Sequence, residues 1–272
     1  MAERAGVAEI VPGLLRIGGV LDLDGRLSWA PAVPGRQQPL NCYVRLDGDD
    51  ATIIETGVSS LRPTIMEQLK AVVPEEQPIL VFITRTELEC SGNLSAITQD
   101  LNVKKVVFGG GGNPFDAYDE ITRGSKAETV ARQALPPAGD MVAPLAGSAS
   151  LFLVPARLRI LTTYWLYDKS TKTLFSSDIF GHTSIAPGGP LVIDRLEDDS
   201  TTTESAREHI LAKFFWLPEA RTELLSTWLE KVFNEIEVEN LAPTHGVVLR
   251  GKALVEKHYN IVQEVLRSPT GN

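Results

Sequence analysis

A short apolar strand followed at once by an acidic loop constrains this chain more than any other segment. Residues 78–83 (PILVFI) form an unbroken apolar run of strand length, and residues 84–94 (TRTELECSGNL) follow directly. Glu87 and Glu89 stand at alternate positions in this loop, before Cys90 and a Ser-Gly-Asn turn. Carboxylates and a thiolate are acceptable ligands for zinc or iron. The segment therefore has the layout of a metal-binding loop at the carboxyl end of a strand.

Arg85 does not fit this interpretation. It stands where such a loop would open with a histidine. A guanidinium stays protonated and only donates hydrogen bonds, so it cannot give a lone pair to a metal. The functional question that the sequence raises is whether this loop still holds a metal.

The remaining pattern indicates mixed layers of strands and helices, hence an α/β (α+β) fold. Alternating or apolar runs predict strands at residues 14–17, 41–46, 52–54, 78–83, 103–108, 151–154, 160–167, 173–175 and 241–242. Apolar residues at helical spacing predict helices at residues 61–72, 93–101, 204–215, 219–233 and 251–267. Residues 181–203 read as a long irregular loop, and a loop of this length is typical of a functional segment. We find no internal repeat and no linker-like composition, so we expect one domain over residues 1–272.

Composition excludes several classes of protein. The chain has 272 residues, 43% of them hydrophobic, and a net charge of −9. This acidic balance argues against a general nucleic-acid binder, which needs basic surface to displace counterions. No apolar run approaches the ~18 residues of a membrane span, and no secretory signal is evident. With only two cysteines, a disulfide framework is not expected, and the cytoplasm is the expected location.

Three segments in order resemble the metallo-β-lactamase domain of flavodiiron proteins. They are TRTELECSGNL at residues 84–94, YDKSTKTLFSSDIFG at residues 167–181 and LAPTHG at residues 241–246. Upstream, residues 41–57 (NCYVRLDGDDATIIETG) are similar to the opening hairpin of that family, with Glu55 in place of its aspartate. The resemblance implies a metallo-β-lactamase-like αββα sandwich over residues 8–268. Family members bind two irons and are fed by a flavodoxin domain, which we do not expect in this chain.

The resemblance places the seven iron ligands of the family on this chain in three groups. Glu87, Asp178 and His245 are of the same type as the family residue. Glu89 and Cys90 are acceptable ligands of changed type, because they stand for an aspartate and a histidine. The other two positions, which are histidines in the family, are arginines here.

These two arginines, Arg85 and Arg159, would empty one iron site. Two guanidiniums repel a divalent ion and supply the same charge of +2 that it would bring. We therefore expect them to replace the metal and to pair with Glu87 and Asp178, since bidentate arginine–carboxylate pairs are strong. The alternative to metal replacement, for either arginine, is that it is an ordinary surface residue that extends into solvent.

The second site would keep four candidate ligands, listed here as Glu89, Cys90, Asp178 and His245. Either it holds one zinc or iron ion, or it holds none, and a metal-free site is favoured. A free cysteine commonly packs as a small buried hydrophobe, and a histidine after a strand can simply hydrogen-bond its neighbours. Of the other histidines, His182 is a weak candidate for substrate contact, whereas His209 and His258 are expected to be structural or exposed.

Three functions from different classes follow. The first is a binding, sensing or pseudo-enzyme protein that has lost the di-iron centre; a homodimer and a small-molecule ligand are its expected partners. The second is a mononuclear metallohydrolase acting on an ester, thioester or lactone. The third is a single-iron oxygen or nitric oxide binder. A remoter, metal-free variant of the hydrolase would use Cys90 as nucleophile and His245 as base, with Asp178 also at the catalytic site.

Overall fold

The computed structural model describes most of the chain as two compact units. The described residues are 6–48, 50–110, 112–115, 126–137, 142–158 and 162–271. The first unit consists of residues 1–19, 40–139 and 159–164, and the second of residues 20–39, 140–158 and 165–272. Each unit is described by itself below, and the expected single domain stays a prediction.

A mixed seven-stranded sheet with the order β1-β2-β3-β4-β5-β6-β7 forms the frame of the first unit. Its strands are β1 (Ala8–Val11), β2 (Leu14–Asp22), β3 (Gln37–Asp47), β4 (Asp50–Ile54), β5 (Ile79–Ile83), β6 (Val103–Gly109) and β7 (Ala131–Leu135). β3 and β4 pair antiparallel, whereas β4 to β7 run parallel. Among the parallel strands, β5 (ILVFI) reads as an apolar run because it is largely buried, whereas β7 (ARQAL) is mostly exposed.

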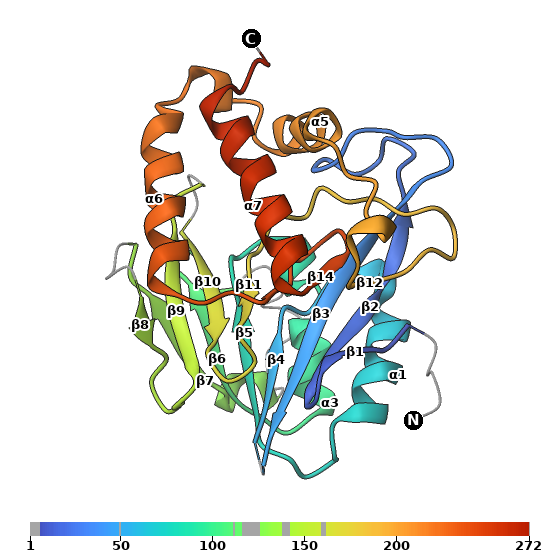
Figure 1. Cartoon of the computed structure of the whole chain (residues 1–272). Helices are drawn as coiled ribbons and strands as arrows, with labels where there is room; N and C mark the ends of the chain where they lie inside the picture. Colours follow the sequence, from blue (N-terminus) through green and yellow to red (C-terminus); the bar gives the residue numbers. More distant parts are fainter. Residues whose placement is uncertain are drawn as a thin grey trace. The chain divides into compact units, whose positions relative to one another are not determined.

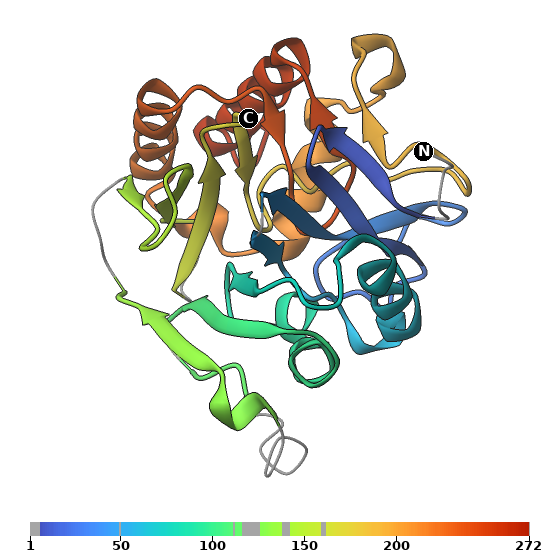
Figure 2. The same ribbon diagram turned by 90° about the horizontal axis from the view of Figure 1, so that it is seen from below.

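Helices α1 (Arg62–Val72) and α3 (Leu94–Asp100) lie along one face of this sheet (Figure 2). α1 begins with Pro63 in its first turn, where a missing N–H costs nothing. Ile65 and Leu69 of α1 and Ile97 of α3 are fully buried against Val81 of β5 in one hydrophobic core. Both helices confirm the predictions within two residues. The acidic loop at residues 84–94, called the polar loop below, contains a short helix that was not predicted, α2 (Leu88–Ser91).

The second unit is built on another mixed sheet of seven strands, with the order β12-β14-β13-β11-β10-β9-β8. The strands are β8 (Ala143–Pro144), β9 (Leu151–Ala156), β10 (Thr163–Asp168), β11 (Thr173–Phe175), β12 (Val192–Ile193), β13 (Asn240–Leu241) and β14 (Val248–Arg250). The predicted loop at residues 181–203 therefore contains β12 and a short 3-10 helix, Leu196–Asp198. β14 is a further strand that the sequence pattern did not indicate.

Three helices pack on the second sheet, and two of them, α6 (Thr222–Glu235) and α7 (Lys252–Arg267), run side by side in Figure 1. The third, α5 (Thr203–Lys213), begins with a capping box: the Thr202 side chain accepts from the Ser205 N–H, and the Ser205 hydroxyl oxygen accepts from the Thr202 N–H. Trp165 of β10 and Trp228 of α6 are buried with their ring centroids 5.0 Å apart. No helix in the described part of the chain combines the length and the hydropathy needed to cross a bilayer.

One buried carboxyl group stands at the carboxyl end of a strand in the first unit. Glu55 follows β4, is 1% exposed and has a φ of 62°, a conformation that is costly for a residue other than glycine. The Thr84 hydroxyl, after the neighbouring strand β5, donates a short hydrogen bond to Glu55 Oε1, and the Thr84 N–H lies 3.4 Å from Oε2. Burial raises the pKa of Glu55 to about 7, although the Arg85 charge opposes this shift.

This raised pKa predicts a pH dependence of stability. The folded protein binds the Glu55 proton more tightly than the unfolded chain, so its contribution to stability is complete below about pH 4.5 and is lost as the pH rises to about 7. Each unit of pKa difference corresponds to roughly 1.4 kcal/mol. Glu55→Gln should therefore gain stability relative to the wild type across this window in urea unfolding at a series of pH values. A wild-type-minus-variant difference that did not change with pH would contradict the assignment.

Candidate functional site

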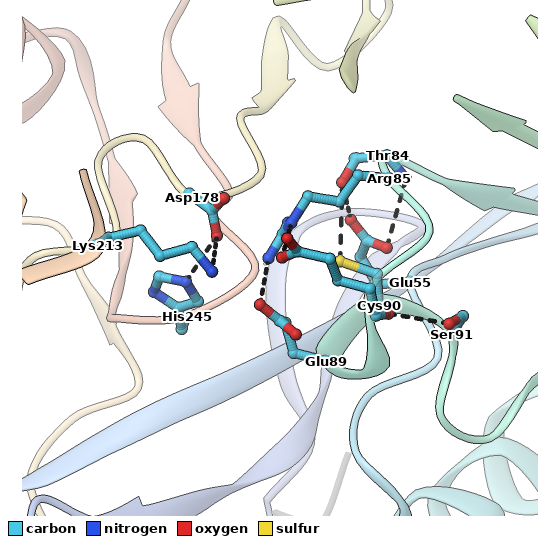
Figure 3. Close-up of polar contacts among 10 residues, drawn as sticks. Glu55, Thr84, Arg85, Glu89, Cys90, Ser91, Asp178, Lys213 and His245 are labelled. Carbon is cyan, nitrogen blue, oxygen red and sulfur yellow. Dashed lines mark hydrogen bonds and ion pairs between the residues drawn. The ribbon is translucent and has the colours of Figure 1, made fainter. Parts of the chain in front are cut away.

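The buried guanidinium of Arg85 is the centre of the polar loop in the first unit (Figure 3). Its side chain is 0% exposed; Arg85 Nε donates to Glu87 Oε2 at 2.8 Å, and Nη2 donates to Glu89 Oε1 at 2.8 Å. Arg85 lies in the bend before α2 and Glu89 lies within α2, so the two side chains meet across the start of this helix. The pairing of Arg85 with Glu87 was expected, whereas the pairing with Glu89 was not, because Glu89 was predicted as a ligand of a second metal.

Cys90 lies on the buried side of the same short helix. Its side chain is fully buried in the hydrophobic core of the first unit, and its Sγ lies 3.9 Å from Thr84 Oγ1. The Cys90 carbonyl accepts hydrogen bonds from the Thr56 N–H at 2.7 Å and from the Thr56 hydroxyl at 2.9 Å. These contacts fix α2 beside the end of β4, so Cys90 has the surroundings of a packed core cysteine.

Two other predicted site residues, Asp178 and His245, form a buried pair in the second unit (Figure 3). Asp178 lies three residues after β11, His245 lies in the segment between β13 and β14, and β11 and β13 are parallel neighbours. His245 Nε2 is 2.9 Å from Asp178 Oδ1. The Lys213 Nζ, from the last turn of α5, lies 3.6 Å from the same carboxylate oxygen. Lys213 was not identified from the sequence, because only the fold brings it to Asp178.

The backbone around Asp178 is strained and closely packed. Ser177 and Phe180 both have positive φ values, 56° and 68°, which non-glycine residues adopt only where the surrounding structure imposes them. Position 181 requires glycine, because a Cβ there would lie 2.4 Å from the His245 carbonyl oxygen and 2.7 Å from His245 Nδ1. Gly181 therefore allows the loop that carries Asp178 to approach His245.

Two further buried histidines, His182 and His258, form a pair in the same unit. His182 Nε2 is 2.9 Å from His258 Nδ1, and His258 Nε2 is 2.8 Å from Asp199 Oδ2, which also pairs with the Lys257 Nζ at 2.7 Å. Burial, followed by the proximity of His258 and His209, holds the pKa of His182 well below its usual value. His258 lies on a helix, as predicted, and is fully buried. No local sequence pattern indicated this network, because its members come from distant segments.

His209, on α5, is the fourth buried histidine of this unit. Its ring centroid lies 6.0 Å from that of His245. The Trp29 ring also stacks on His245, with the two ring centroids 5.8 Å apart. Burial, followed by the proximity of His245, lowers the pKa of His209 to about 3, so the ring is neutral at physiological pH.

Arg159, the second arginine predicted to replace a metal, lies outside the described residues. Within the described ranges, no group of three or more His, Cys, Asp or Glu side chains is arranged to hold a metal ion. The candidate ligands contact protein groups instead: Glu87 and Glu89 bind Arg85, whereas Asp178 binds His245 and Lys213. The roles predicted for these residues in metal binding or catalysis stay predictions.

Comparison with solved structures finds relatives of low sequence identity over almost the whole chain. A fragment named diflavin flavoprotein A 5 from Nostoc sp. PCC 7120 is 17% identical, with a TM-score of 0.65 and coverage of 96% of each chain. The rubredoxin oxygen:oxidoreductase of Desulfovibrio gigas is 16% identical, with a TM-score of 0.67; it covers 96% of this chain, which in turn spans 61% of the oxidoreductase. At these identities the likeness shows the fold alone.

The chemotaxis sensor ODP of T. denticola, in its apo state, is also similar. It is 15% identical, with a TM-score of 0.57, and the alignment covers 91% of this chain and 94% of the sensor. Another structure of chemotaxis sensor ODP, 16% identical to this chain, holds a peroxy diiron species. No curated protein matches the chain.

The match to a protein-family model establishes the family to which the chain belongs. The model described as "ODP family beta lactamase" matches residues 39–246, which include the polar loop, Asp178 and His245. The predicted metallo-β-lactamase-like fold, with two mixed seven-stranded sheets flanked by helices, is thereby confirmed. The chain belongs to the ODP family of β-lactamase-fold proteins.

Proposed function

We propose that this ODP-family chain is a binding or sensing protein in which a buried arginine replaces one iron of the di-iron centre. The observation that carries the proposal is the fully buried Arg85 guanidinium, which bridges Glu87 and Glu89 at 2.8 Å each. Chemotaxis sensor ODP supports the sensing part, since a relative of the same family is named for that role. A small-molecule ligand and a homodimer belong to this proposal as expected partners.

The charge of Arg85 opposes a metal ion at this position. At an effective dielectric constant of about 20, two unit charges 4 Å apart interact by about 4 kcal/mol, and a divalent ion doubles this repulsion. Both carboxylates that could neutralise an incoming ion already accept hydrogen bonds from Arg85. A guanidinium also cannot become a ligand by losing its proton. The residues of the first unit therefore do not fit an iron ion while Arg85 is in place.

A second candidate function rests on the other pair. Asp178 and His245 are buried ligand types that lie within hydrogen-bond distance of each other. A single zinc or iron ion at these two residues would support a metallohydrolase or an oxygen or nitric oxide binder. Lys213, 3.6 Å from Asp178 Oδ1, opposes this alternative because it already supplies a positive charge to the carboxylate.

Restoring the family histidines should restore metal binding. Arg85→His combined with Arg159→His removes both positive charges and restores an imidazole at the two positions where the resemblance places histidine ligands. We expect this double variant to bind more Fe(II) or Zn(II) than the wild type, as measured by elemental analysis after reconstitution and desalting.

The matched control is Arg85→Lys combined with Arg159→Lys, which keeps both charges and adds no ligand of the family type. It should bind no more metal than the wild type. If the histidine variant folds and gains no metal over this control, the proposed replacement is wrong.

Removing Arg85 should also destabilise the fold. Arg85→Met leaves Glu87 and Glu89 without their guanidinium, and breaking a buried ion pair costs about 3–5 kcal/mol. Replacing both glutamates by glutamine in the same chain should recover part of this loss, because neither side chain then carries an uncompensated charge. The measurement is urea unfolding. Arg26→Met, which removes an exposed partner of Asp24, is the control and should have little effect. An Arg85→Met variant as stable as this control would contradict the account.

A further inference from the structure

Asp178 of the second unit is a carboxylate that the fold removes from water. Its side chain is 1% exposed, as is that of His245, whose Nε2 lies 2.9 Å from Asp178 Oδ1. A buried carboxylate is costly unless a positive charge or hydrogen-bond donors lie beside it. The protein itself supplies a positive charge here, because the Lys213 Nζ lies 3.6 Å from the same oxygen (Figure 3).

Lys213 is held at this carboxylate and does not extend into solvent. It is the last residue of α5, a position from which a long basic side chain can normally reach water. Its side chain is nevertheless only 11% exposed. The neighbouring residues explain this burial, since Ile210 and Phe214 are buried in the hydrophobic core of the second unit and fix the end of the helix there.

Trp29 makes a second contact with the Lys213 ammonium. The Nζ lies 5.8 Å from the centre of the Trp29 ring, within the range of a cation–π interaction. The same ring stacks on His245, with ring centroids 5.8 Å apart and planes at 22°. The loop that carries Trp29 is closed by a backbone hydrogen bond from the Leu23 N–H to the Arg36 carbonyl at 3.0 Å. A carboxylate and an aromatic face, each positioned by the fold, thus stabilise one ammonium.

The donor set at this pair does not fit a metal ion. Zinc sites in proteins have three or four protein ligands, whereas Asp178 and His245 supply one carboxylate and one imidazole. In the part of the chain that the structure describes, no third His, Cys, Asp or Glu completes such a set. An ion bound to Asp178 Oδ1 would lie within about 6 Å of the Lys213 Nζ, since a zinc–oxygen bond is about 2 Å long. The two positive charges would repel each other at a buried position, where screening is weak.

We propose that Lys213 is a built-in cation of the second unit, which takes the place of a metal ion at Asp178 and His245 and closes this pair to metal. The ammonium brings the positive charge that the carboxylate requires, and the Trp29 ring covers the imidazole. The inference goes beyond the proposed function, which rests on Arg85 in the first unit and accounts for one iron position only. It also excludes the single-metal alternative at Asp178 and His245. The two claims can fail separately, because every variant below keeps Arg85.

Lys213→Met tests the inference, because it removes the charge and keeps a side chain of similar length. We expect this variant to bind Zn(II) at least about ten-fold more tightly than the wild type in isothermal titration calorimetry. Its melting temperature should rise with the Zn(II) concentration, since a ligand of the folded state stabilises that state. The melting temperature of the wild type should not change. Lys213→Arg, which keeps the charge, is the matched control and should behave as the wild type.

Further variants make the outcome decisive. Lys213→Glu replaces the ammonium by a third ligand and should bind Zn(II) more tightly than Lys213→Met. Adding His245→Gln to Lys213→Met should abolish the gain, which separates this site from adventitious metal binding elsewhere. Folded Lys213→Met and Lys213→Glu variants that bind no more Zn(II) than Lys213→Arg would overturn the proposal.

A measurement on the wild type keeps the test valid if a variant does not fold. Paramagnetic Co(II) should leave the His245 ring resonances of the wild type unshifted in NMR spectra, because Lys213 excludes the ion. A large shift of these resonances at one equivalent of Co(II) would show that the pair accepts a metal beside Lys213, and the proposal would be wrong.

Discussion

The buried guanidinium of Arg85 fixes the chemistry of the first unit. A charge that is fully removed from water must be paired, and Arg85 is paired with two carboxylates of its own loop. This requirement holds Glu87 at the start of α2 and Glu89 within it, on the side where Arg85 lies. Cys90, on the other side of the same helix, then packs into the hydrophobic core. Arg85 thus orients two neighbouring candidate ligands, Glu87 and Glu89.

The second unit also pairs buried carboxylates with cations, which here are lysines. Lys213 approaches Asp178 from the end of α5, and its ammonium also lies 5.8 Å from the centre of the Trp29 ring. Asp199 pairs with Lys257 in the same way, beside His258. In each case a lysine from a helix balances a buried carboxylate that also contacts a buried histidine. Both carboxylates therefore orient a histidine.

Strong local patterns made most of the fold predictable from the sequence. The helix at residues 61–72 and the strand at residues 78–83 follow from apolar spacing, and the structure places α1 and β5 there. The helix α2 has only four residues, too few for a periodic pattern of apolar side chains, so it could not be predicted from the sequence. The Arg85–Glu87 pair was predictable because the residues are close in sequence. The contacts of Lys213 with Asp178 and of His182 with His258 depend on the fold, and no local sequence pattern predicts them.

The central claim is that protein charges have replaced metal in the first unit, and the iron content of the wild type tests it most directly. The protein would be loaded anaerobically with Fe(II) without chelator, desalted, and analysed for iron per chain. Replacement of one iron by arginine predicts at most one equivalent, with no signature of an iron pair in Mössbauer spectra. Two equivalents with a spin-coupled pair would contradict it.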